Sequence, residues 1–125
     1  MNTRTYLSVA GAIGIIFGLG YLLVPVLAGG LVFKFDTPAS ILFGRFIGAY
    51  LLMWGAIGFV LRNSTDKQAL RGVLQVTAIG HVITIALFLI GLTSGVSSVF
   101  GWGNVILSVV LGIGAIYCLP RGDVS

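Results

Sequence analysis

Four long apolar segments constrain the fold of this chain more than any other feature of its sequence. They cover residues 6–27, 40–61, 70–92 and 102–119. A helix needs about 20 apolar residues to cross a hydrocarbon core of about 30 Å, whereas a membrane-spanning strand is about half as long and alternates in polarity. We therefore predict an all-α fold: one integral membrane domain in which four helices form a bundle.

The scarcity of charged residues excludes the water-soluble alternatives. Hydrophobic residues make up 58 % of the 125 positions and charged residues only 8 %, against about 25 % charged residues in an ordinary soluble domain. Such a chain cannot cover a globular surface with polar side chains, and it is too apolar to be disordered. The net charge of +4 does not indicate a nucleic-acid partner, because the basic residues stand at the ends of the apolar segments.

These basic residues predict the orientation of the bundle. If the N-terminus is cytoplasmic, five of them lie on the cytoplasmic side: Arg4, Arg62, Lys67, Arg71 and Arg121. Only Lys34 and Arg45 then lie towards the opposite side. Since cytoplasmic loops carry the excess of Lys and Arg, both termini are predicted to be cytoplasmic.

Short polar sequences between the apolar segments contain the expected helix caps. Thr37 or Ser40 is expected to cap the second helix, with Pro38 in its first turn. Ser64, Thr65 or Asp66 is expected to cap the third helix, because these side chains accept hydrogen bonds from the free N–H groups of a first turn.

Small and polar residues gather on one face of each predicted helix. On the first helix this face consists of Gly11, Gly14, Gly18, Tyr21 and Pro25. On the second helix it consists of Arg45, Gly48, Ala49, Leu52, Gly55 and Ala56. Because helices in lipid associate through close backbone packing and hydrogen bonds, we expect these faces to point into the bundle. The pairs Gly14–Gly18 and Gly44–Gly48 serve either this internal packing, which we favour, or dimerisation.

Six residues are candidates for binding a ligand: Arg45, His81, Tyr21, Thr84, Asn104 and Ser108. In the predicted orientation, His81 lies near the middle of its helix and the others lie in the outer half of the bundle. Two interpretations remain open: the six side chains line one outward-facing polar cavity, or they form ordinary hydrogen bonds between helices, which we favour.

Arg45 and His81 each have a structural and a functional interpretation, and we favour the structural one for both. Arg45 either pairs with Asp36 or a lipid phosphate, or forms an anion site at the outer mouth of the bundle, because ionisable groups inside a membrane are costly. His81, the only histidine, is either a neutral imidazole bonded across the bundle or an axial ligand of a tetrapyrrole.

One segment resembles a known family. Leu42–Leu52 contains the pattern R-x-x-G-x-x-L-L at the start of the second apolar segment. With the glycine-rich first segment and four spans in one short chain, it resembles the small bacterial DoxX-like group of four-span membrane proteins. The resemblance implies a four-helix bundle in a bacterial cytoplasmic (inner) membrane and a role as an accessory subunit, and it supplies no catalytic residues.

The inventory of reactive residues argues against an enzyme. One histidine, one cysteine and three acidic residues leave no nucleophile–base–acid set and no cysteine cluster for a metal, so we expect no metal and no cofactor. We predict a non-enzymatic membrane protein: an accessory subunit, or a bundle that binds lipid or a small apolar ligand. Its expected partners are membrane lipids and either another membrane protein or further copies of itself. The alternatives are a small transporter or channel that uses Arg45, and a tetrapyrrole-binding redox subunit that uses His81.

Overall fold

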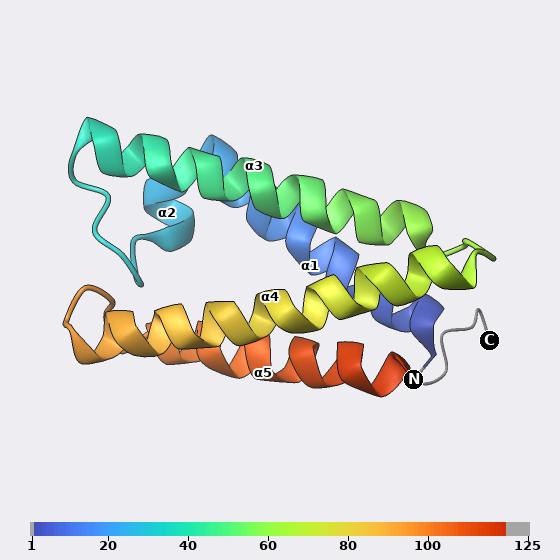
Figure 1. The fold of residues 1–125 in the computed structure, drawn as a ribbon. Coiled ribbons are helices and arrows are strands. Elements are labelled where there is room, and N and C mark those ends of the chain that lie inside the picture. Colours follow the sequence, from blue (N-terminus) through green and yellow to red (C-terminus); the bar gives the residue numbers. More distant parts are fainter. Residues whose placement is uncertain (1, 120–125) are drawn as a thin grey trace.

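The computed structural model describes residues 2–119 of the chain. Within this range it is all helical, with α1 (Thr3–Leu23), α2 (Pro25–Gly29), α3 (Pro38–Leu61), α4 (Lys67–Thr93) and α5 (Gly101–Cys118) (Figure 1). The four long helices are each long and apolar enough to cross a membrane. The predicted all-α fold with four long apolar helices is therefore confirmed, and the short helix α2 is an addition to it.

The helix caps resolve the alternatives left open by the sequence. Thr37 caps α3 through a reciprocal pair of hydrogen bonds, in which Ser40 N donates to Thr37 Oγ1 and Thr37 N donates to Ser40 Oγ, each at 3.1 Å. Asp66 caps α4 by accepting from the backbone N–H groups of Gln68 at 3.0 Å and Ala69 at 3.1 Å. Both caps satisfy first-turn donors that have no partner inside the helix.

The first long helix ends earlier than its apolar segment. We predicted helix over residues 6–27, but α1 ends at Leu23 and the chain turns at Val24, whose φ and ψ are −136° and 62°. The cause is Pro25, which lacks a backbone N–H and disfavours a helical conformation in the residue before it. Pro25 instead occupies the first turn of α2, so the apolar stretch is divided into a long helix and a short one.

Helices α1 and α3 pack with their backbones in close contact. A Cβ atom at Gly14 would lie 2.9 Å from Gly55 Cα, and one at Gly11 would lie 2.8 Å from Gly55 O. Gly18 meets the backbone of α3 at Gly48 in the same way. The glycines predicted on the inward face of α1 therefore do serve packing inside the bundle.

The buried face of α3 differs from the predicted one. Its buried residues are all glycines, Gly44, Gly48, Gly55 and Gly58, whereas Arg45 and Ala49 are exposed. The predicted positions of Gly48 and Gly55 are confirmed, and the backbone of Leu52 also contacts Gly18. Because α1 approaches to backbone distance, Gly44 faces inward in place of Arg45, and the buried face is rotated by about one residue from the one that we expected.

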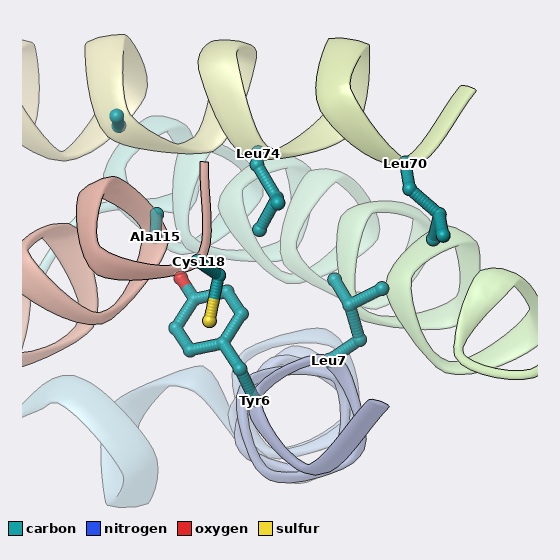
Figure 2. Close-up of a cluster of buried hydrophobic side chains, with 7 residues drawn as sticks. Tyr6, Leu7, Leu70, Leu74, Ala115 and Cys118 are labelled. Carbon is teal, nitrogen blue, oxygen red and sulfur yellow. The ribbon is translucent and has the colours of Figure 1, made fainter. Parts of the chain in front are cut away.

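Helices α4 and α5 form a second pair, and the two pairs converge at the end of the molecule that carries the N-terminus (Figure 1). Figure 2 shows the buried cluster that joins them there. Its members come from α1, α4 and α5: Tyr6, Leu7, Leu70, Leu74, Ala78, Ala115 and Cys118. Tyr6 Oη also donates a hydrogen bond of 2.8 Å to Leu111 O on α5. We call this group the core cluster.

The pairs diverge towards the other end of the bundle (Figure 1). At that end a loop of one pair is hydrogen-bonded to a loop of the other. Ser98 N, in the α4–α5 loop, donates a hydrogen bond of 2.9 Å to Val32 O in the loop that follows α2, and the Ser98 hydroxyl bonds Leu31 O. The rings of Phe33 and Phe88 lie 5.6 Å apart. We call these contacts the loop clip.

Candidate functional site

A cavity of about 490 Å³ lies between the α1–α3 pair and the α4–α5 pair, with lining residues from all four long helices. Its volume falls within the range of about 300–1,000 Å³ that is typical of sites for small molecules. Ala10 and Leu111, which line it, also pack on the core cluster. Phe33 and Phe88 of the loop clip line its other end, so the cavity occupies the space created where the two pairs diverge.

Five of the six predicted candidates line this cavity: Tyr21, His81, Thr84, Asn104 and Ser108. Tyr21 and Ser108 are each only 6 % exposed, and the other three are half-buried. They come from three helices, so the fold brings together side chains that are up to 87 positions apart in the chain (108 − 21).

These five residues do not hold the helices together by hydrogen bonds. Thr84 Oγ1 donates to Gly80 O at 2.9 Å, within its own helix. Among residues 2–119, the side chains of Tyr21, His81, Asn104 and Ser108 form no hydrogen bond. The hydrogen bonds between helices that we favoured are therefore not formed in the described chain, and five of the six side chains face one cavity instead.

Arg45 is the exception among the six, and its expected place in the cavity is wrong. It is exposed on α3 and is not among the residues that line the cavity. Its neighbour Gly44 faces inward in its place, against Pro25 and Phe35. The described part of the chain also shows no ion pair between Arg45 and Asp36. An anion site that combines Arg45 with the other five candidates is therefore not formed.

Sequence reasoning missed the apolar wall of the cavity. Ile47, Leu51 and Trp54 of α3 and Phe17 of α1 line it. Ile47, Leu51 and Trp54 follow one another at helical spacings of four and three, a pattern that the sequence does contain. Phe33 was not predictable in this way, because a loop brings it to the cavity.

The lining of the cavity is uncharged and combines apolar walls with a few hydrogen-bonding groups. None of the lining residues is an Asp, Glu, Lys or Arg, and within residues 2–119 no group of three His, Cys, Asp or Glu side chains is arranged to hold a metal ion. Hydroxyl, amide, imidazole and indole groups provide hydrogen bonding among aliphatic and aromatic walls. Such a site can position a ligand and shield it from water.

Comparison of the chain with protein-family models, with curated proteins and with solved structures found no match. The interpretation of the site therefore depends on its own geometry and chemistry.

Proposed function

We propose that this chain is an integral membrane protein whose bundle binds an uncharged, lipid-soluble small molecule in the cavity between its two helix pairs. The observation that carries the proposal is that Tyr21, His81, Asn104 and Ser108 face one cavity with no hydrogen-bond partner in the described chain. The polar atoms of these four side chains are accessible from the cavity, since Thr3 Oγ1 is the only fully buried side-chain N or O atom without a partner in the described chain. Where the cavity holds no water, such unpaired groups cost free energy. A bound molecule with hydrogen-bonding groups would pair with these side chains and recover that free energy.

Placement in a membrane is supported by the four long apolar helices and by the large apolar side chains on the outside of the bundle. Leu27, Val60 and Val99, for example, are each more than 70 % exposed, and lipid suits them where water does not. Because Arg4, Lys67 and other basic residues are concentrated at one end, we propose that both termini are cytoplasmic, and that the membrane is the bacterial inner membrane.

The absence of charge in the lining supports an uncharged ligand. A carboxylate or ammonium group in this cavity would lose its hydration without meeting an opposite charge, which is strongly unfavourable. The cavity is also continuous with the outer surface of the bundle, since Ile47 and Leu87 line it and are 42 % and 63 % exposed. A molecule dissolved in the bilayer can reach it between α3 and α4.

We propose further that the protein is not an enzyme and acts as a binding or accessory subunit. The lining residues offer contacts for holding a ligand and no carboxylate or thiol for attacking one. The resemblance to DoxX-like proteins favours the same role and implies a membrane protein partner or self-association.

Native mass spectrometry of the protein released from mild detergent tests the binding proposal. We expect a retained adduct of a few hundred daltons, within the size class that such a cavity accepts. Ser108→Leu, which fills the cavity with a larger apolar side chain, should abolish this adduct. Val110→Leu is the matched control, because Val110 lies on the same helix, is 61 % exposed and does not line the cavity.

Two results would contradict the proposal. An adduct that survives Ser108→Leu would place the ligand elsewhere. A Soret absorption band that copurifies with the protein and is lost in His81→Leu would instead show a tetrapyrrole-binding protein.

A further inference from the structure

The polar side chains of the cavity are concentrated on one wall. His81 and Thr84 come from α4, Ser97 from the α4–α5 loop, and Asn104 and Ser108 from α5. The lining residues of α1 and α3 carry polar side-chain atoms only in the Tyr21 hydroxyl and the Trp54 indole. The α4–α5 wall therefore carries most of the polar side chains, set among apolar residues such as Leu87, Leu107 and Leu111, and the α1–α3 wall is almost wholly apolar. We call the α4–α5 side the polar wall.

The polar wall extends along the bundle axis. His81 lies beside Gly112 of α5, since a Cβ atom at Gly112 would lie 3.2 Å from His81 Cβ. Asn104 precedes Gly112 by eight positions (112 − 104), which corresponds to about 12 Å along a helix. Ser108 lies between these levels on α5. Hydrogen-bonding groups therefore follow the length of the cavity and do not gather at one end.

The facing wall is shaped for a broad apolar surface. Ile13 and Phe17 of α1 and Leu51 and Trp54 of α3 provide aliphatic and aromatic side chains. Gly14, also in the lining, lies where α1 and α3 touch. This part of the wall is fixed by backbone contact, so it changes shape less easily than a wall made only of long side chains.

Building on the proposed function, we infer that the ligand is a facial amphiphile: an uncharged molecule with a broad apolar face and with hydroxyl or carbonyl groups along the opposite edge. Its polar edge lies along the α4–α5 wall and its apolar face lies on α1 and α3. A molecule with one polar head and an apolar tail fits less well, because its head reaches one end of the row formed by His81, Asn104 and Ser108 and its tail would leave the others without a partner. Ser108 carries the argument most directly, since it is 6 % exposed and its hydroxyl has no partner in the described chain.

Two neutral probes with the same ring skeleton test this inference. Methyl cholate carries several hydroxyls on one face, whereas methyl lithocholate carries a single hydroxyl at one end. The protein has two tryptophans; Trp102 does not line the cavity, so the Trp102→Phe protein in lipid nanodiscs reports binding through Trp54 fluorescence. We expect methyl cholate to bind about tenfold more tightly, since two or more additional hydrogen bonds each contribute a modest net amount.

Variants of the polar wall separate this preference from simple partitioning into lipid. The double variant Asn104→Leu, Ser108→Ala should reduce the preference for methyl cholate to about twofold or less. Thr93→Val is the control, because the Thr93 hydroxyl is exposed and bonds its own helix. Three results would overturn the inference and leave the proposed function intact. They are equal affinity for both probes, an unchanged preference in the double variant, and tighter binding of monoolein, a third probe with one polar head and an apolar tail. If no probe binds and the native mass spectrum shows no adduct, the proposed function itself fails.

Discussion

Two buried hydroxyl groups that lie within one turn of each other along α5 have different tasks. Tyr6 is 2 % exposed and donates a hydrogen bond to Leu111 O, so its hydroxyl helps to join α1 to α5. Ser108 is almost as deeply buried, but its hydroxyl is left free for the cavity. The same kind of group therefore contributes to stability in one place and, on our proposal, to binding in the other.

Removing the Tyr6 hydroxyl tests its structural task. We expect Tyr6→Phe to lower the free energy of unfolding by about 1 kcal/mol, because the hydrogen bond that joins α1 to α5 is lost. Denaturant unfolding in mixed micelles measures the change. Tyr50→Phe, at a side chain that is 67 % exposed, should change stability by much less; equal effects would show that the Tyr6 hydrogen bond contributes nothing.

The sequence predicted five of the six cavity candidates but misplaced Arg45. His81, Thr84, Asn104 and Ser108 are spaced so that any inward-facing arrangement of α4 and α5 brings them to the interior. Arg45 is adjacent to Gly44, and a difference of 100° in rotation decides which of the two faces inward. That rotation depends on how closely α1 approaches, which periodicity alone does not determine.

Among the helices, the α1–α3 contact depends most on residue size. A Cβ atom at Gly55 would lie 2.6 Å from Ile15 N and 2.7 Å from Gly11 O, and backbone atoms cannot rotate away as a side chain can. Small residues thus define this interface, as in other membrane helix pairs.

We expect Gly55→Ala to destabilise the bundle by about 1–3 kcal/mol, because α1 and α3 must move apart to accept one methyl group. Gly80→Ala on α4 is the matched control. A Cβ atom there meets nothing within 4 Å, so this change should be neutral or slightly stabilising. Thermal unfolding of both variants in the same detergent provides the comparison, and a loss of stability in Gly80→Ala as large as that in Gly55→Ala would contradict this view of the interface.

Helix ends were more predictable than helix partners. Caps such as Thr37 and Asp66 act through residues that are close in sequence, so local patterns reveal them. The break at Val24 also has a local cause in Pro25. The pairing of α1 with α3 and of α4 with α5 depends on contacts between distant segments, and single-helix patterns do not specify it.

For the whole molecule, orientation in the membrane can be tested directly. Cys118 is the only cysteine, so Cys118→Ser provides a background for single reporters. With cytoplasmic termini, Lys34→Cys should react with a membrane-impermeant maleimide added outside intact spheroplasts, whereas Lys67→Cys should react only after permeabilisation. The opposite pattern would invert the proposed topology, and labelling of both sites from outside would indicate mixed insertion.

The cavity itself was not predictable from the sequence, because it arises from the divergence of the two pairs. Each helix face suggests inward contacts, but only the combination of the core cluster at one end with the loop clip at the other leaves space between them. Phe33 illustrates the difficulty, since its contact with Phe88 depends on the path of a loop.

Because the two pairs are packed together at the core cluster, a change in the angle between them displaces their walls more with increasing distance from that cluster. The core cluster reaches Cys118, and Asn104 lies 14 positions before it on α5 (118 − 104), which is about 20 Å along a helix. A change of about 5° in the angle between the pairs would therefore move their walls by about 2 Å at the level of Asn104. In the membrane location that we propose, a thinner or thicker bilayer would act on this angle against the loop clip, which ties the two pairs together at the far end.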